Sequence, residues 1–181
     1  AETLSPPTTM DLGSPETISM EDNDMMTDLS ASEGRLPDLS QVGSYGVRQN
    51  SSSILVTGCN MRHTIYSPIG LASPPIVIIG HGFARGPGSM SSWAEHFSSW
   101  GVKVLLPELC HYNIFAGVDH ELNGRNLVEL ARHYSADNVV YIGHSAGGLA
   151  SIIAASQDDN AAGILGLDIV DTQDIPGVRD F

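Results

Sequence analysis

Basic residues are scarce in this chain. Its 181 residues include 8 lysines and arginines against 21 aspartates and glutamates, which gives a formal net charge of −13. Proteins that bind nucleic acid normally carry a basic patch, and anionic lipid headgroups attract the same kind of patch. We therefore expect no nucleic-acid partner and no docking on an anionic membrane, whereas a neutral or apolar substrate is compatible with this charge.

Cysteine is equally rare, with two residues, Cys59 and Cys110. Two are too few for a disulfide framework, and spacing alone leaves open whether they form one bridge or two buried thiols.

There is no run of about 18 apolar residues, so we expect no membrane span. No signal peptide is visible, and the chain starts with alanine, as it would after removal of a leader. We expect a secreted or periplasmic protein, with a cytoplasmic one as the alternative.

Sequence patterns for nucleotides and metals are also missing. Residues 80–86 are spaced G-x-G-x-x-x-G, which departs from the dinucleotide pattern, and no Gly-Lys-Ser/Thr occurs. No helix is predicted to carry two histidines at i and i+4 with a glutamate between them. We therefore expect neither an organic cofactor nor a metal site.

The acidity is concentrated at the start of the chain. Residues 1–40 hold nine acidic residues and one base, Arg35, for a net charge of −8. This segment is rich in Ser, Thr, Pro and Met, and it cannot bury enough apolar surface to offset its chain entropy. We expect residues 1–40 to be a disordered acidic leader and residues 41–181 to form part of one folded domain.

The rest of the chain predicts an α/β protein. Three short strands are expected first, as an antiparallel entry to the sheet, at residues 42–49, 53–57 and 61–66. Strands then alternate with helices, which indicates βαβ units and a parallel sheet. The expected strands lie at residues 76–80, 102–106, 139–143 and 163–169, and the expected helices at residues 92–100, 119–134 and 146–156.

The helix at residues 92–100 has its own signals. Ser92 and Glu95 fit a capping box, and Trp93, Phe97 and Trp100 fall on one face. We expect the helix to begin at Ser92 and to bury that face.

Residues 141–150, Y-I-G-H-S-A-G-G-L-A, break an apolar strand with a glycine-rich turn before a helix. This is the context that the G-x-S-x-G motif requires. A bulky residue two positions before or after the serine would collide with neighbouring backbone, so glycine is used at both. We predict that Ser145 is a nucleophile and that the Ala146 N–H, at the helix N-terminus, stabilises an oxyanion. The alternative is a strand–helix junction without chemistry.

Several local patterns occur together with this turn. They are His81-Gly82-Phe83 after a buried strand, Trp93 in the first helix, Pro107-Glu108 after the next strand, and Gly-Leu-Asp ending at Asp168. From about Val42 to Phe181 the chain resembles the first two-thirds of an α/β-hydrolase-fold serine esterase of the chlorophyllase, dienelactone hydrolase and polyester-hydrolase branch. The resemblance implies a mostly parallel sheet with helices on both faces and the C-terminal part lacking. It also implies ester hydrolysis through a serine acyl-enzyme without metal or cofactor.

The resemblance assigns two further residues. It makes Phe83 N–H the second oxyanion donor, where the alternative is that the nearby glycines only form a flexible turn. It makes Asp168 the triad acid, because Gly-Leu-Asp ends the strand after the elbow helix. Asp171 and Asp174 are the runners-up, and many relatives place the acid one strand later, which would be beyond Phe181. The remaining alternative is that all three acids form a solvated turn.

The base that should activate Ser145 is not evident. In this fold the chain order is Ser, then Asp or Glu, then His, but all seven histidines precede Ser145. We expect the part of the domain that carries the histidine to be missing. If an upstream histidine serves instead, His81 and His111 are the first candidates.

The sequence thus favours a serine hydrolase acting on small or polymeric carboxylic esters, with an inactive hydrolase-fold binding module as the alternative. Uncharged medium-chain or aromatic esters are the expected substrates. Apolar residues expected in loops near the site are Phe83, Trp93, Tyr112, Ile114 and Phe115, although Trp93 and Phe115 fit the core equally well. The sequence does not indicate an oligomeric state.

Overall fold

The computed structural model describes residues 37–113 and 117–170. The prediction for residues 1–40 falls almost entirely outside this part of the chain and stays a prediction. Within the described residues, no helix has both the length and the apolar character needed to cross a membrane.

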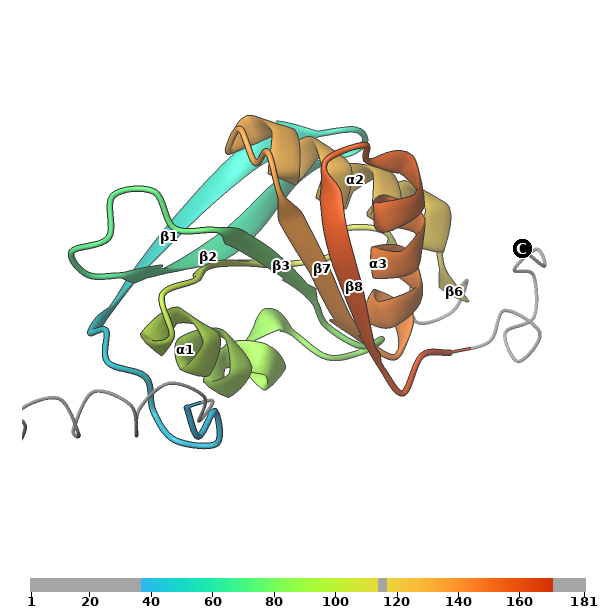
Figure 1. Ribbon diagram of the computed structural model, residues 1–181. Helices are drawn as coiled ribbons and strands as arrows, with labels where there is room; N and C mark the ends of the chain where they lie inside the picture. Colours follow the sequence, from blue (N-terminus) through green and yellow to red (C-terminus); the bar gives the residue numbers. More distant parts are fainter. Residues whose placement is uncertain (1–36, 114–116, 171–181) are drawn as a thin grey trace, which may run out of the picture. The chain divides into compact units, whose positions relative to one another are not determined.

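A six-stranded sheet organises the described residues, with strand order β1-β2-β4-β3-β7-β8 (Figure 1). Its strands are β1 (Val47–Val56), β2 (Cys59–Pro68), β3 (Ile76–Gly80), β4 (Lys103–Pro107), β7 (Val139–His144) and β8 (Ala161–Leu167). The β1–β2 and β2–β4 pairs are antiparallel, and β4, β3, β7 and β8 are mutually parallel. The expected mixed sheet with an antiparallel entry is therefore confirmed.

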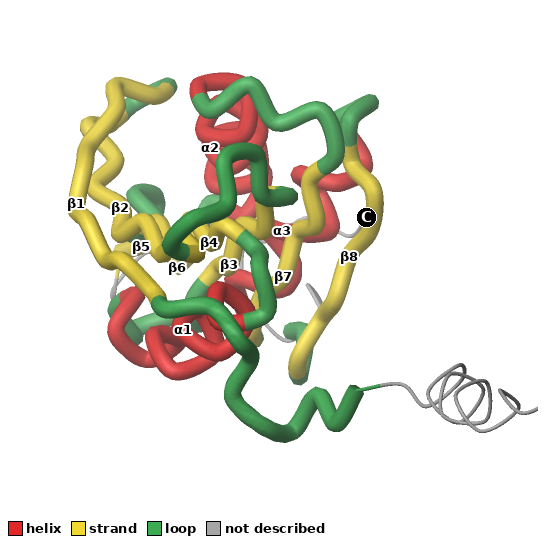
Figure 2. The backbone as a smooth tube through the Cα atoms, turned by 60° about the vertical axis from the view of Figure 1, so that its left-hand side comes forward, coloured by secondary structure: helices red, strands yellow, loops and turns green. Residues whose placement is uncertain are grey.

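Helices cover both faces of this sheet (Figures 1 and 2). One face carries α1 (Ser91–Ser99), preceded by the short 3-10 helix η1 (Pro87–Met90), and the other carries α2 (His120–His133) and α3 (Ala146–Gln157). The loop between β4 and α2 contains two short paired strands, β5 (Tyr112–Asn113) and β6 (Gly117–Val118).

The core consists of two apolar clusters separated by the sheet. Ile76 and Ile78 of β3 belong to the cluster that includes residues of α2 and α3, and Val77 and Ile79 belong to the cluster under α1. Successive side chains of a strand point to opposite faces, so a continuous apolar run is what a strand buried on both faces requires. All five residues of β3 are buried, as the sequence predicted.

The first predicted strands were wrong in their boundaries. Residues 50–52, Asn-Ser-Ser, do not separate two strands but lie in the middle of β1, which pairs with β2 without interruption from Val47↔Pro68 to Val56↔Cys59. Because β1 is an edge strand, its polar side chains face water, while its backbone groups form hydrogen bonds with β2. A two-residue turn, Thr57-Gly58, closes the hairpin, with Gly58 at a φ of 82°.

The predicted start of the first helix was also wrong. The N-cap of α1 is Met90, without a side-chain cap, so Ser92 and Glu95 form no capping box. The buried face consists of Ala94, Ser98 and Ser99, whereas Trp93 is 46% exposed. The helix ends as expected, with Gly101 at a φ of 91°.

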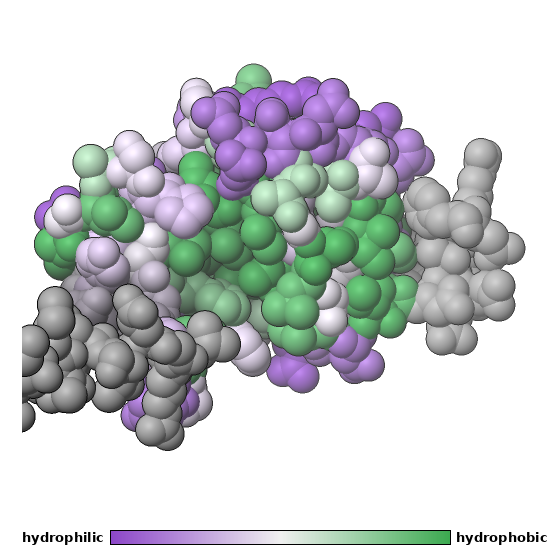
Figure 3. Space-filling view, viewed as in Figure 1, coloured by the Kyte–Doolittle hydropathy of each residue, from purple (hydrophilic) through white to green (hydrophobic). Residues whose placement is uncertain are grey.

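Strand β8 forms the outer edge of the parallel part of the sheet. It begins and ends two residues earlier than predicted, and the register shift between Val139 and Val140 accompanies its start. Ile164, Leu165 and Ile169 are each at least 40% exposed, and Figure 3 shows apolar surface over β8. An apolar edge strand can pair with other chains.

We expect Leu165→Lys, at the β8 edge, to reduce self-association and the binding of a hydrophobic dye. The charge opposes edge-to-edge pairing, and a half-exposed site should cost less than about 1 kcal/mol of stability. The matched control is Leu55→Lys on β1, the opposite edge, where Leu55 is 84% exposed. Light scattering and dye fluorescence of both variants measure the effect. An equal effect of the two substitutions would contradict the role of β8.

Candidate active site

Ser145 lies at the junction between β7 and α3. Its backbone has φ 53° and ψ −121°, a conformation that side-chain-bearing residues rarely adopt and that costs on the order of 1–3 kcal/mol. The helix starts immediately after it, because Gly148 N–H and Leu149 N–H both donate to Ser145 O. The sharp strand-to-helix turn predicted from the sequence is thus present.

Glycines make this turn possible. A Cβ on Gly143 would collide with the Gly147 carbonyl, and a Cβ on Gly147 would collide with the backbone of Gly80 at the end of β3. A Cβ on Gly80 would in turn lie 2.9 Å from Gly147 O. The backbones of β3, β7 and α3 therefore meet with no space for a side chain, which is the steric reason predicted for both glycines of the motif.

The loop after β3 runs beside the serine. A Cβ on Gly82 would lie 2.9 Å from His144 Nδ1 and 3.4 Å from Ser145 Cβ. Phe83 and Ala146, the two predicted oxyanion donors, line the same small cavity of about 10 Å³, enough for one water-sized group. Within the described residues, neither Phe83 N–H nor Ala146 N–H donates a hydrogen bond. Their role as oxyanion donors stays a prediction.

His81 fixes the loop and is not available as a base. Its Nε2 accepts a hydrogen bond of 3.1 Å from Leu109 N–H, so the proton resides on Nδ1, which donates to Gly82 O at 2.9 Å. Burial lowers the pKa of His81, while the bond to Gly82 opposes that change. The neutral ring thus ties the loop after β3 to the loop after β4.

Two residues of α2 that the sequence did not single out also support the site. His120 Nδ1 lies 3.3 Å from Ala146 O, and burial lowers its pKa. Asn123 lines the small cavity and exchanges two hydrogen bonds of 3.0 Å with the backbone of His111. Both side chains are buried within the helical layer, and only their packing reveals their role.

Asp168 follows β8 at the same end of the sheet as Ser145. Leu167 O accepts a 3.0 Å hydrogen bond from Ser145 N–H, so the candidate acid directly follows the residue bonded to the serine backbone. Asp168 is exposed, with a φ of 48°. Its position suits the predicted role, which stays a prediction. Asp171 and Asp174 lie outside the described residues.

No histidine nitrogen in the described part of the chain is hydrogen bonded to the Ser145 hydroxyl. His144 precedes the serine, and its ring lies against Gly82. His111 Nε2 lies 3.1 Å from Thr57 O. His63 lies near Tyr134 and His96 binds Leu39 O. The structure therefore supplies no base for Ser145 from these side chains.

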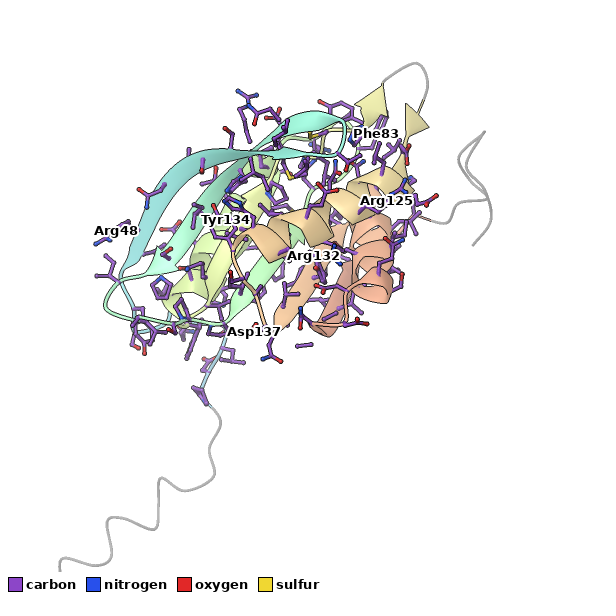
Figure 4. The ribbon with its side chains drawn as sticks, turned by 90° about the horizontal axis from the view of Figure 1, so that it is seen from above. Arg48, Phe83, Arg125, Arg132, Tyr134 and Asp137 are labelled. Atoms are coloured by element: carbon purple, nitrogen blue, oxygen red, sulfur yellow. A yellow bond between two sulfur atoms is a disulfide. The ribbon has the colours of Figure 1, made fainter. Side chains whose placement is uncertain are left out.

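Of the apolar residues expected around the site, some line its cavity and one lies elsewhere. Phe83 packs edge-on against Tyr112, with ring centroids 6.1 Å apart, and both line the small cavity. Figure 4 shows Phe83 at the opposite end of the sheet from Asp137, which precedes β7. Trp93 instead lies on α1 with Phe97 and lines a separate groove with Leu39. Ile114 and Phe115 lie outside the described residues.

The two cysteines of the chain are paired with each other. Cys59, at the start of β2, and Cys110, in the loop after β4, form a disulfide with a Cα–Cα distance of 6.3 Å. The bridge joins the β1–β2 hairpin to the loop that carries Leu109 and Tyr112.

Comparison with solved structures identifies the fold. Epoxide hydrolase A from Mycobacterium thermoresistibile matches with a TM-score of 0.57 and 24% identity, over 66% of this chain and 39% of that chain. The fold is that of the α/β-hydrolases. Brefeldin A esterase, a bacterial homologue of human hormone sensitive lipase, matches with a TM-score of 0.53 and 17% identity, over 72% of this chain and 41% of that chain.

A third α/β-hydrolase neighbour is an N-acyl homoserine lactonase, with a TM-score of 0.56 and 15% identity, over 71% of this chain and 49% of that chain. The chain thus spans less than half the length of each of these three proteins. No protein-family model and no curated protein matches the sequence. The identities are low, so the structural likeness establishes the fold, and the narrower resemblance to chlorophyllases and their relatives is not confirmed.

We expect Gly147→Ala to destabilise the protein by at least about 3 kcal/mol, because the new Cβ would collide with backbone that cannot move away. Gly86→Ala is the matched control, since Gly86 faces open space, and it should stay within about 1 kcal/mol. Urea denaturation of both variants provides the measurement. Similar stabilities of the two variants would contradict the close approach of β3, β7 and α3.

Stability should also fall with acidification below neutral pH. Burial lowers the pKa values of His63, His81 and His120 from 6.5, so the unfolded state binds protons more readily than the folded state. The free energy of unfolding should therefore be highest above pH 6.5 and decrease as the pH falls, before the carboxylates titrate. Denaturation at pH 7.5, 6.5 and 5.5 tests this. His120→Gln should reduce the slope, and a flat profile for the unaltered protein would refute the prediction.

Proposed function

We propose that this protein is a serine hydrolase that acts on carboxylic esters. One observation carries the proposal: the strained backbone of Ser145 lies beside the loop that carries Phe83 and directly before Ala146, and within the described residues neither amide N–H donates a hydrogen bond. A hydroxyl lifted from a tight turn beside free N–H donors suits nucleophilic attack on a carbonyl carbon, since the donors stabilise the oxygen that becomes negative.

The chemistry follows from these groups. Ser145 Oγ attacks the ester carbonyl, and the oxyanion forms hydrogen bonds to the two amides, of which Ala146 N–H also benefits from its place at the start of α3. The alcohol leaves and an acyl group remains on Ser145 until water releases it. Asp168 orients the base that takes the serine proton, and none of the histidines of the described residues is assigned to that base.

The proposed substrates are uncharged esters with medium-chain or aromatic groups, as in the chlorophyllase, dienelactone hydrolase and polyester-hydrolase branch. Phe83 and Tyr112 present exposed aromatic rings beside the amides. Apolar rings at a site favour apolar acyl groups over cationic ones. The esterase and the lactonase among the structural neighbours also act on compounds with an ester linkage, as their names indicate.

The second candidate function is a binding module on an inactive hydrolase fold. The absence of a histidine bonded to Ser145 among the described residues favours it. The two functions differ in whether Ser145 reacts with an electrophile.

We propose a secreted or periplasmic location. The Cys59–Cys110 disulfide supports it, because such bonds persist in oxidising compartments. A cytoplasmic location is the alternative, and there the two thiols would stay reduced.

A fluorophosphonate probe tests the proposed function on the protein as its cells make it, with its natural ends. We expect one covalent adduct, located on Ser145 by mass spectrometry, and ester turnover that falls by several orders of magnitude in Ser145→Ala. Ser156→Ala, at the far end of α3, is the matched control and should keep both. No adduct, or an adduct on another residue, would refute the nucleophile and favour the binding module.

A further inference from the structure

Three side chains with metal-binding atoms lie together outside the candidate active site. The sulfur atoms of Cys59 and Cys110 and a ring nitrogen of His111 lie within 4.8 Å of one another. They come from two segments, the start of β2 and the loop after β4, and all three are half-buried. Ester hydrolysis by Ser145 uses none of them.

The hydrogen bonding of His111 leaves one ring nitrogen available. Thr57 O can only accept, so Nε2, 3.1 Å away, carries the proton and donates it. In the neutral ring the lone pair is then on Nδ1. Metal-binding histidines have this arrangement, in which one nitrogen donates to a backbone carbonyl and the other binds the ion.

The ligands are held in place by more than the disulfide. Asn123 binds both the N–H and the carbonyl of His111 at 3.0 Å. The turn that carries Thr57 is fixed by Glu129, which accepts hydrogen bonds from Thr57 N–H at 2.9 Å and Thr57 Oγ1 at 2.7 Å. Gly58 contributes as well, because a Cβ there would lie 2.8 Å from His111 Cε1. These contacts hold His111 and the hairpin turn independently of the Sγ–Sγ bond.

We propose that Cys59, Cys110 and His111 form a zinc site when the disulfide is reduced. A tetrahedral Zn²⁺ with Zn–S bonds of about 2.3 Å and a Zn–N bond of about 2.0 Å places its ligand atoms about 3.5–3.8 Å apart. The two sulfurs, which are bonded to each other in the disulfide, move apart to reach this spacing, and a ring nitrogen of His111 already lies within 4.8 Å of both. Two thiolates, Nδ1 and one water complete the four ligands, and the two negative sulfurs balance the charge of the ion.

Each step of the conversion is balanced. A phosphine reductant supplies two electrons and becomes a phosphine oxide with the oxygen of one water, while the Sγ–Sγ bond breaks and each sulfur gains a proton. Zn²⁺ then displaces both thiol protons into solvent and forms two Zn–S bonds and one Zn–N bond. The disulfide and the metal site are therefore alternative states of the same three side chains.

The test is zinc titration of the whole 181-residue chain before and after reduction with a phosphine. We expect the reduced protein to bind one Zn²⁺ with a Kd below about 1 μM and the oxidised protein to bind none. Zinc should protect both thiols from a thiol reagent. Co²⁺ in place of Zn²⁺ should give thiolate-to-metal charge-transfer absorption, a signal that shows sulfur ligation independently of any enzymatic activity.

Three substitutions separate this site from adventitious binding. His111→Ala should weaken zinc binding at least tenfold, and His111→Cys should restore it by supplying a third thiolate. His133→Ala, an exposed histidine outside the cluster, should leave binding unchanged. Circular dichroism verifies the fold of the reduced protein. A folded reduced protein that binds no zinc, equal effects of His111→Ala and His133→Ala, or loss of the fold on reduction would each overturn the proposal.

Discussion

The rest of the site depends on how closely the backbones of β3, β7 and α3 approach one another. Gly80, Gly143 and Gly147 lie at the three contacting points, and no side chain fits between them. This approach forces Ser145 into a positive φ and leaves the Ala146 amide at the start of α3 without an acceptor in the described residues. The strain at the serine costs on the order of 1–3 kcal/mol. The two apolar clusters, one on each face of the sheet, offset it.

Local steric requirements are what the sequence predicted well. The elbow depends on residues within five positions of one another, so Gly143, Ser145 and Gly147 revealed it. The continuous apolar run of β3 also revealed a strand buried on both faces, because this pattern too lies within five neighbouring residues. By contrast, β1 could not be delimited, because an exposed edge strand tolerates Asn50 and its polar neighbours once β2 satisfies its backbone.

Features that depend on packing between distant segments could not be predicted. Glycine usually weakens a helix, yet Gly124 is required within α2, because a Cβ there would lie 2.6 Å from Ile153 Cγ2 of α3. The absence of a cap at Ser92 depends on η1, which starts the helical turn early. His81 was a candidate base until its bond to Leu109 showed that both ring nitrogens are occupied.

The loop after β4 connects the candidate active site with the cysteine–histidine cluster. Leu109 N–H binds His81, the His111 backbone binds Asn123, and Tyr112 packs on Phe83. None of these contacts passes through the Cys59–Cys110 bond. Breaking that bond removes a covalent tether but not the hydrogen bonds that set the loop conformation. The oxyanion amides should therefore keep their positions in both states of the cluster, so that reduction and metal binding change the stability of the hairpin and loop more than the chemistry at Ser145.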